Sequence, residues 1–220
     1  MKTLLSWSSG KDSAWSLHLL RQDPSTDVVG LVTTINAAFD RVAMHGVRRS
    51  ILEAQARAAG LPLFVIELPW PCSNETYAQL MGDFVASQVA NGIAAMAFGD
   101  LFLEDIRAYR ETQLAGSGLK PLFPLWKLPT AQLARDMIDG GLVTYVATAD
   151  PRHLDRSFAG RRFDAAFLAD LPSSVDPCGE NGEFHTCVAA GPMFSHALDL
   201  DVGEVVERDG FLFADLSLRS

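Results

Sequence analysis

The chain has 220 residues, 48% of them hydrophobic, a length that suits one large domain or one domain with a smaller second lobe. Its formal net charge of −9 argues against unassisted binding to nucleic acid or to an anionic membrane. No stretch reaches the roughly 18 consecutive apolar residues of a membrane span, so we expect no transmembrane helix.

The first half of the chain alternates short β-like runs with amphipathic helical ones. Strands are predicted at 3–7, 28–35, 62–68 and 94–100, and helices at 12–22, 46–60 and 74–92, the last capped by Asn74. This βαβαβαβ rhythm predicts an α/β fold with a doubly wound, Rossmann-like parallel sheet. Ligands in such folds lie beyond the carboxyl ends of the strands. The polar strand tips at 8–13, 33–36 and 99–100 are therefore expected to face one crevice.

The second half of the chain is less regular. A helix is predicted at 129–141 and a strand at 142–148, and a polar loop rich in turn-forming residues follows Leu171. The alternating runs after this loop predict either a small antiparallel sheet or a strand added to the main one. We therefore expect a smaller α+β lobe in the C-terminal half.

The stretch SSGKDS follows the first predicted strand and opens the first helix. It is not a Walker A loop, because Gly10-Lys11 is followed by Asp12, and it is not a GxGxxG loop, because Gly10 stands alone. Free N–H groups at a helix start, small side chains, hydroxyls and one lysine still favour an anion. The alternative is a surface turn in which Ser9 or Asp12 caps the helix.

A second polar stretch, DPCGENGEFHT, lies at 176–186. Gly179 and Gly182 make its backbone pliable, and Glu180 and Glu183 stand three apart. Paired carboxylates of this kind can bind a cationic substrate, orient ammonia or share a metal. The alternative is an exposed loop whose acids are incidental. Further polar groups in the stretch are Asn181, His185 and Thr186.

Four stretches in this order, SSGKDS, FGDL, GLKPLFPLW and DPCGENGEFHT, resemble the diphthine–ammonia ligase family, which belongs to the PP-loop ATP pyrophosphatases. The resemblance runs from Leu4 to about Phe194. It implies an adenine nucleotide alpha hydrolase-like fold, with a PP-loop ATP-binding domain at 1–117 and a substrate-binding lobe at 118–220. Enzymes of this group split ATP into AMP and pyrophosphate to activate a carbonyl or a carboxylate.

The SGGxDS loop of the family grips the phosphates of ATP. Ser9 replaces the usual glycine, a change that we expect to be tolerated if its φ is negative. The resemblance also places Thr33 beside the adenosine and makes His45 a nucleotide or substrate contact, whereas the alternative for His45 is a residue at a helix entry. The phosphate-binding role is carried to Ser8, Ser9, Gly10, Lys11, Asp12 and Ser13.

The GD pair at the tip of the fourth predicted strand matches the family as well. It implies that Gly99 and Asp100 contact the nucleotide. Asp12 and Asp100 are the candidates for holding Mg²⁺, which prefers carboxylate oxygens.

Two arginines follow on the next predicted helix. Arg107 and Arg110 stand three apart and so share a face, from which they can neutralise pyrophosphate or an acyl-phosphate transition state. The alternative is ion pairing with Glu104 or Glu111.

The stretch at 176–186 matches the family element that is linked to recognition of diphthine and ammonia. The resemblance implies a catalytic role for Lys11, Asp12, Glu180 and Glu183. The residues implied in substrate binding are Arg107, Arg110, Glu180, Asn181, Gly182, Glu183, His185 and Thr186.

Together these features predict an AMP-forming ligase that uses ATP and Mg²⁺ to join ammonia to a substrate carboxylate. The expected partner is a small-molecule or protein-borne carboxylate, with no nucleic acid and no membrane, and a homodimer is one option. One rival is a PP-loop enzyme that thiolates or amidates tRNA, and another is a non-catalytic ATP-binding sensor.

The cysteines bear on the alternative of a tRNA-thiolating enzyme. Cys178 and Cys187 flank the acidic stretch, where they are either sulfur-transfer groups or ordinary buried thiols. The chain has 3 cysteines and no CxxC pair, which argues against a disulfide framework or a zinc ribbon. The apolar run at the start breaks at Ser8, so no signal peptide is expected, and we predict a cytoplasmic protein.

Overall fold

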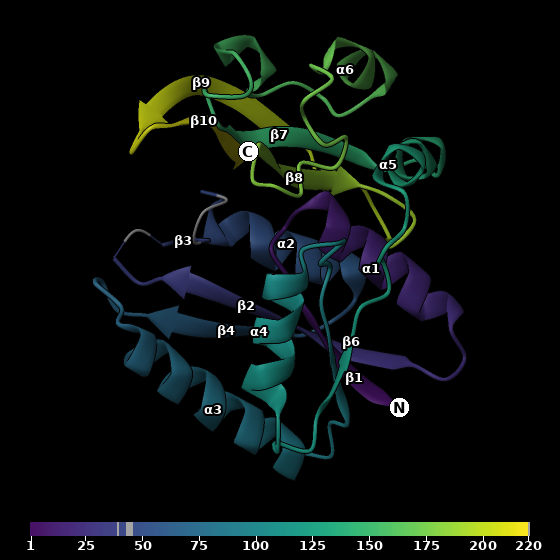
Figure 1. Cartoon of the computed structure of the whole chain (residues 1–220), viewed down its shortest axis with the longest axis vertical. Coiled ribbons are helices and arrows are strands. Elements are labelled where there is room, and N and C mark those ends of the chain that lie inside the picture. Colours follow the sequence, from purple (N-terminus) through teal and green to yellow (C-terminus); the bar gives the residue numbers. More distant parts are fainter. Residues whose placement is uncertain (39, 43–45, 220) are drawn as a thin grey trace.

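The chain folds around two β-sheets, as shown by a computed structural model that describes residues 1–38, 40–42 and 46–219 (Figure 1). The first sheet holds β1 (Lys2–Ser6), β2 (Asp27–Asn36), β3 (Arg41–Val42), β4 (Leu63–Leu68), β5 (Ala95–Ala97) and β6 (Lys120–Leu122). The second holds β7 (Val143–Ala149), β8 (Phe184–Ala190), β9 (Leu200–Arg208) and β10 (Phe211–Leu218). The helices are α1 (Lys11–Gln22), α2 (Arg49–Ala59), α3 (Asn74–Ala90), α4 (Glu104–Leu114), α5 (Thr130–Asp139) and α6 (Ala165–Asp170), with a 3₁₀ turn at Arg156–Phe158.

Strands β1 and β5 lie side by side at the centre of the first sheet. β2 and then β4 extend the sheet from β1, and β6 extends it from β5, all with parallel pairing. The short β3 pairs with β2 in the antiparallel sense. The chain thus builds outward from β1 to β4 and then returns with β5 to the other side of β1. This reversal is a switch point of the kind beyond which parallel α/β sheets bind ligands, and the predicted doubly wound fold is confirmed.

Helices cover both faces of the first sheet. α1 and α2 lie between it and the second sheet, whereas α3 and α4 lie on its opposite face (Figure 1). Side chains alternate between two cores: Leu5 and Leu31 pack on the side of α1 and α2, and Leu4 and Val32 pack on the side of α3 and α4. The near-continuous apolar run of β2 is explained by this covering of both faces.

Two helix starts differ from the prediction. α3 is capped by Ser73, whose hydroxyl accepts from the N–H of Thr76, and not by Asn74. The N-cap of α1 is Gly10, which has no capping side chain, so neither of the two side chains considered for this role performs it. The first N–H groups of α1 therefore need other partners.

The second sheet is antiparallel, in the order β8-β7-β10-β9, and is separate from the first. Of the two predicted alternatives, the small antiparallel sheet is the one observed. Its strand β8 packs against α1. β6 still pairs with β5 in the first sheet, so the chain leaves that sheet after Leu122 and not after residue 117. We propose that the division between the domains falls between β6 and α5.

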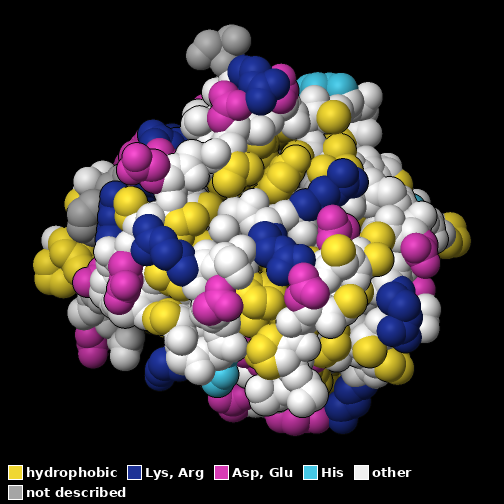
Figure 2. Space-filling view, turned by 90° about the horizontal axis from the view of Figure 1, so that it is seen from above, with side chains coloured by type: hydrophobic (Ala, Val, Ile, Leu, Met, Phe, Trp, Pro, Cys, Tyr) yellow, Lys and Arg dark blue, Asp and Glu magenta, His cyan; other side chains and the backbone are white. Residues whose placement is uncertain are grey.

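The surface carries charges of both signs. On the face seen in Figure 2, basic and acidic side chains are interspersed, with apolar side chains between them, so this face presents no continuous basic field. None of the helices within the described residues is long and apolar enough to span a membrane.

Candidate functional site

A cleft opens beyond the carboxyl ends of β1 and β5, at the switch point of the first sheet. It has a volume of about 210 Å³ and lies between the loop 8–13, the strand tip 98–100 and the loop that leads into β8. Segments from the N-terminal and the C-terminal halves of the chain thus line the same cleft. Of the residues predicted to form a site, it brings together Ser8, Gly10, Lys11, Asp12, Ser13, Gly99, Asp100, Arg110, Glu180, His185 and Thr186.

The loop 8–13 leads directly from β1 into the first turn of α1. The N–H of Lys11, the first residue of the helix, donates to the hydroxyl of Thr186 at 3.0 Å. The hydroxyls of Ser8 and Ser13 lie 3.4 Å apart at the cleft. The next N–H groups of this turn have no acceptor inside the helix. They and the hydroxyl of Ser8 can donate to an anion, which the positive end of the helix also attracts, whereas the Ser13 hydroxyl donates to the carbonyl of Gly10 at 2.9 Å.

Ser9 departs from the expected loop geometry. Its φ is 73°, in the left-handed region, so the condition under which we expected the glycine replacement to be tolerated is not met. This conformation costs a non-glycine residue roughly 1–2 kcal/mol. Ser9 is fully buried, and its carbonyl accepts from the N–H of Val188 at 3.0 Å. Contact with β8 therefore helps to hold the strained residue in place.

Lys11 and Asp12 form an ion pair at the floor of the cleft. Lys11 Nζ donates to Asp12 Oδ2 at 2.8 Å and to the carbonyl of Cys178, and the Lys11 side chain is 2% exposed. Burial lowers the pKa of Lys11, but Asp12 and neighbouring acidic groups outweigh burial and raise it. Burial raises the pKa of Asp12, against the opposing effect of Lys11. Lys11 therefore remains charged and ties α1 to the loop 176–183, which we call the acidic loop.

Gly99 and Asp100 close one side of the cleft at the tip of β5. A Cβ at position 99 would lie 3.0 Å from the backbone of Asp12, so a larger residue there would push the tip of β5 away from the first turn of α1 by a few tenths of an ångström. Asp100 Oδ2 lies 3.7 Å from Arg110 Nε, and burial raises the pKa of Asp100. The Arg110 guanidinium lies 5.1 Å from the centre of the Phe98 ring, which holds it at the wall of the cleft.

Arg107 lies outside the cleft, unlike Arg110. Its Nε donates to Glu111 at 2.8 Å, and its guanidinium lies 4.8 and 4.7 Å from the ring centres of Phe123 and Trp126. The ion-pair alternative therefore describes Arg107. Residues three apart on a helix differ in direction by about 60°, which is enough to turn one arginine into the cleft and the other onto the aromatic rings.

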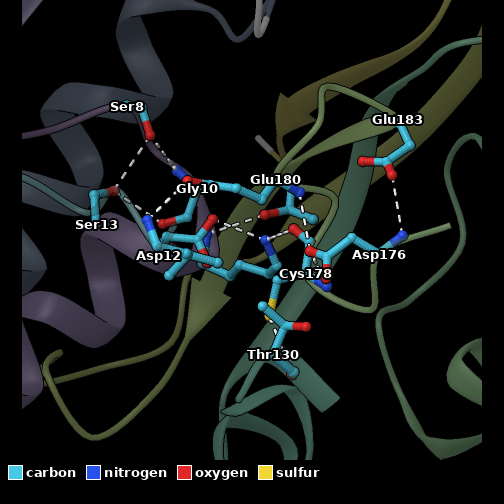
Figure 3. Close-up of polar contacts among 12 residues, drawn as sticks. Ser8, Gly10, Asp12, Ser13, Thr130, Asp176, Cys178, Glu180 and Glu183 are labelled. Carbon is cyan, nitrogen blue, oxygen red and sulfur yellow. Dashed lines mark hydrogen bonds and ion pairs between the residues drawn. The ribbon is translucent and has the colours of Figure 1, made fainter. Parts of the chain in front are cut away.

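Glu180 reaches across the cleft from the acidic loop. Its Oε1 accepts from the N–H groups of Leu101, at 2.7 Å, and Phe102, at 3.4 Å, which links the acidic loop to the segment before α4. Figure 3 shows Glu180 close to Asp12. Burial raises the pKa of Glu180 to about 7. This carboxyl group can therefore bind or release a proton near neutral pH.

Glu183 points away from the cleft, contrary to the expectation that both glutamates face it (Figure 3). Its carboxylate accepts from the N–H groups of Asp176 and Asn181 and from the Asn181 side chain, each at 3.0 Å. Burial raises the pKa of Glu183, but these hydrogen bonds outweigh burial and lower it. Asn181 and Gly182 lie in the same turn and likewise do not line the cleft. Glu183 therefore stabilises the turn of the acidic loop from the side that faces away from the cleft.

The histidine and the thiols near the acidic loop are held in neutral forms. Burial, and then Lys11, lowers the pKa of His185 to about 4. Burial raises the pKa of Cys178, and it raises the pKa of Cys187 to about 12. A thiol must ionise to act as a nucleophile. These cysteines therefore lack the property that the sulfur-transfer alternative requires.

Of the two remaining predicted nucleotide contacts, one lies away from the cleft and the other falls outside the described residues. Thr33 is buried in β2 and does not line the cleft, and its hydroxyl has no hydrogen-bond partner in the part of the chain that the structure describes. Thr33 lies two residues from both Leu31 and Ile35 in β2 and so shares the face of the strand that packs on α1 and α2. Its side chain therefore enters the core and does not project from the end of the strand. His45 lies outside the described residues.

Sequence reasoning missed several residues that line the cleft, namely Ser6, Phe98, Cys178, Gly179 and Phe184. Ser6 ends β1 and Phe98 precedes the GD pair, so their position beside recognised motifs was the available signal. Cys178, Gly179 and Phe184 lie inside the stretch at 176–186, but the apolar side chain of Phe184 gave no reason to place it at a polar site. Its ring centre lies 5.4 Å from Lys11 Nζ, a contact that exists only because β8 packs on α1.

Two carboxylate oxygens of the cleft are suited to a metal ion. Asp12 Oδ1 and Asp100 Oδ2 are buried and accept no hydrogen bond from any described residue. Mg²⁺ usually takes one or two protein carboxylates and fills its other positions with phosphate and water. Among residues 1–38, 40–42 and 46–219, no group of three or more His, Cys, Asp or Glu side chains is arranged to hold a metal unaided. The two aspartates thus fit an ion that arrives with phosphates.

Known proteins resemble this chain over most of its length. The family model described as the diphthamide synthase N-terminal domain matches residues 1–121, and the one described as the C-terminal domain matches residues 129–214. A diphthine–ammonia ligase of Danio rerio is 26% identical over 231 residues, covering 94% of this chain and 89% of that protein. A diphthine–ammonia ligase of Schizosaccharomyces pombe is 32% identical over 94 residues, covering 41% of this chain and 16% of that protein. Because the first family model spans more than half of the chain and the second matches most of the remainder, the chain belongs to the diphthamide synthase family.

Proposed function

We propose that this protein is an ATP-dependent ligase that adenylates a substrate carboxylate, with release of pyrophosphate, and joins ammonia to it as an amide. Its named relatives are ligases that act with ammonia. The observation that carries the proposal is that the loop 8–13, the Gly99-Asp100 tip and Glu180 line a single cleft at the switch point of the sheet.

The triphosphate lies against the start of α1 in this proposal. The N–H groups of the first turn and the hydroxyl of Ser8 supply hydrogen bonds that phosphate oxygens can accept. The hydroxyl of Ser13 can join them if it leaves the carbonyl of Gly10, to which it donates at 2.9 Å. Because Asp12 partly neutralises Lys11, much of the attraction comes from the backbone. Asp12 and Asp100 would hold Mg²⁺, which offsets the negative charge of the phosphates.

Adenylation solves a chemical difficulty of the reaction. A carboxylate is a poor acceptor for ammonia because it is resonance-stabilised and has no leaving group. In the first step a carboxylate oxygen bonds to the α-phosphorus as the bond to pyrophosphate breaks. In the second, ammonia bonds to the carbonyl carbon of the acyl-adenylate and AMP leaves with the electrons of the broken C–O bond. The protein chiefly positions the reactants and neutralises charge.

Two side chains of the cleft suit the acceptor half of the reaction. The guanidinium of Arg110 lies at the cleft wall, where it can meet the acceptor carboxylate or the departing pyrophosphate. Glu180 has a pKa of about 7, which suits a group that takes a proton from ammonium at neutral pH. The N–H groups of Leu101 and Phe102 fix the direction of its carboxyl group.

The test is to incubate the full chain with MgATP, ammonium and a panel of small carboxylates and carboxylate-bearing peptides, and to identify the nucleotide product. Release of AMP and pyrophosphate that depends on one carboxylate supports the ligase. Release of ADP and phosphate contradicts it, and ATP binding without any turnover favours the sensor.

Arginines of α4 provide a matched pair of variants for this assay. Arg110→Gln removes the cation at the cleft wall and is expected to impair turnover, whereas Arg107→Gln removes an arginine that lies outside the cleft and is expected to retain it. Equal activity of the two variants would contradict the role given to Arg110.

A further inference from the structure

Gln55 is a buried polar residue to which the proposed function gives no role. It lies on α2, and none of its surface is exposed. Every polar atom of its carboxamide has a partner. Trp7 Nε1 donates to Gln55 Oε1 at 2.9 Å, and Gln55 Nε2 donates to the carbonyls of Ser9, at 3.1 Å, and Val188, at 2.7 Å.

These partners leave one orientation for the Gln55 carboxamide. An indole N–H can only donate, and backbone carbonyls can only accept. The oxygen of Gln55 must therefore face Trp7, and its two N–H donors must face Ser9 and Val188. The residue thus joins the end of β1 at Trp7, the loop 8–13 and β8 through groups that cannot exchange roles.

The direction of the Ser9–Gly10 peptide follows from this contact. In a planar trans peptide, the carbonyl of Ser9 and the N–H of Gly10 point in opposite directions. The Ser9 carbonyl is held towards α2 and β8 by Gln55 and by the N–H of Val188. The N–H of Gly10 is consequently turned the other way, towards Ser8 Oγ at 3.4 Å and the cleft.

We propose that Gln55 is a positioning residue that fixes the Ser9–Gly10 peptide in the direction needed to bind an anion. The inference rests on the proposed function only in taking that anion to be the triphosphate of ATP. Rotation of this peptide changes ψ of Ser9 and φ of Gly10, and a glycine accepts either sign of φ. Loss of the Gln55 donors leaves the Ser9 carbonyl with the N–H of Val188 as its partner, so the peptide is held less firmly, and a rotated peptide turns a carbonyl oxygen, which repels phosphate, into the cleft.

The first test compares Gln55→Met with Gln88→Met by calorimetric titration with MgATP. Both glutamines are buried, but Gln88 lies on α3, across the first sheet. Gln55→Met is expected to weaken MgATP binding about tenfold, the effect of losing roughly one buried hydrogen bond, while Gln88→Met leaves it within about twofold of wild type. Wild-type affinity in Gln55→Met, with only the melting temperature lowered, would overturn the inference.

A second readout does not depend on ATP. In a crystal structure of Gln55→Met without nucleotide, the Ser9–Gly10 peptide is expected to rotate so that the Ser9 carbonyl turns to the cleft. Gln55→Glu, which keeps the acceptor for Trp7 but loses both donors, is expected to do the same and serves if the methionine variant does not fold. An unchanged peptide in the variant contradicts the role of Gln55, whereas a wild-type protein that binds no MgATP contradicts the proposed function instead.

Discussion

The backbone N–H of Lys11 donates to Thr186 Oγ1 at 3.0 Å, so a side chain from the second sheet caps α1, the helix that follows β1 of the first sheet. Thr186 lies on β8 and Lys11 begins α1. The shape of the loop 8–13 therefore depends on the C-terminal half of the chain, and the two halves have to fold together to make the cleft.

Removing the Thr186 hydroxyl tests this dependence. Thr186→Val keeps the shape of the side chain but leaves a buried N–H without an acceptor, so we expect it to lower the free energy of unfolding by about 1–3 kcal/mol. Thr186→Ser keeps the hydroxyl and is expected to stay within about 1 kcal/mol of wild type. Urea denaturation of both variants measures the difference, and equal stability would refute the capping role.

Variants of the Lys11–Asp12 ion pair allow effects on stability to be distinguished from effects on catalysis. Lys11→Met leaves Asp12 without its partner and is expected to destabilise the fold by roughly 3–5 kcal/mol and to abolish turnover. Adding Asp12→Asn removes the unpaired acid, so the double variant is expected to regain most of the stability but no turnover. Unfolding curves and AMP release measure the two effects, and a double variant that turns over ATP would show that the pair has no role in catalysis.

The overall architecture was predictable because it depends on local patterns. Apolar runs such as 28–35 mark strands that are covered on both faces, and their alternation with helical runs fixes a parallel sheet with its ligand site at the strand tips. What could not be predicted depends on distant contacts. β6 lies beyond the predicted boundary because it pairs with β5, and the order of the second sheet is set by packing between strands that carry similar patterns.

Glu180 gives the protein a defined pH dependence. Burial raises its pKa to about 7 from an ordinary value of 4.5, so the folded state favours the protonated form. Its contribution to stability is complete below pH 4.5 and is lost as the pH rises through 7. Glu180→Gln keeps an acceptor for Leu101 but cannot ionise. We therefore expect the variant to gain stability relative to wild type between pH 5 and pH 8, measured by urea denaturation, and to lose the rise of ligase activity around pH 7.

The pKa of Glu183 is shifted in the opposite direction to that of Glu180, so its effect on stability has the opposite dependence on pH. Its hydrogen bonds lower its pKa below the ordinary value of 4.5, so its contribution to stability is present above that pH and is lost as the pH falls through the lowered pKa. Glu183→Gln places an NH₂ group against N–H donors and is expected to cost about 1–3 kcal/mol at pH 7, with the difference from wild type shrinking in acid. Glu111→Gln on the exposed face of α4 is the control, with an expected effect below about 1 kcal/mol. Matching urea curves for the two variants would contradict the role of Glu183 in shaping the loop.

Gly99 tests the close approach of the two strand tips. Gly99→Ala puts a Cβ 3.0 Å from the backbone of Asp12, so one tip must shift, and we expect MgATP to bind at least about tenfold more weakly. Gly82→Ala is the matched control, because nothing lies within 4 Å of its Cβ. Titration calorimetry compares the two, and an unaffected Gly99→Ala variant would show that the spacing of the tips is unimportant for nucleotide binding.

The candidate site was predictable to the extent that its residues lie in motifs at strand tips. The loop 8–13, the GD pair and Glu180 meet in the cleft as their positions along the chain suggest. Glu183 faces the other way, since the acidic loop turns between the two glutamates and spacing alone does not give direction. Gln55 is one polar residue on an otherwise apolar helix face, and its role becomes visible only when Trp7, Ser9 and Val188 are seen around it.

The most direct test of the central claim is a crystal structure of the protein with Mg²⁺ and a non-hydrolysable ATP analogue. The account predicts that the triphosphate accepts hydrogen bonds from the N–H groups at the start of α1 and that the α-phosphorus faces Glu180 across the cleft. A nucleotide seated away from this cleft, or a triphosphate that leaves the loop 8–13 untouched, would contradict it.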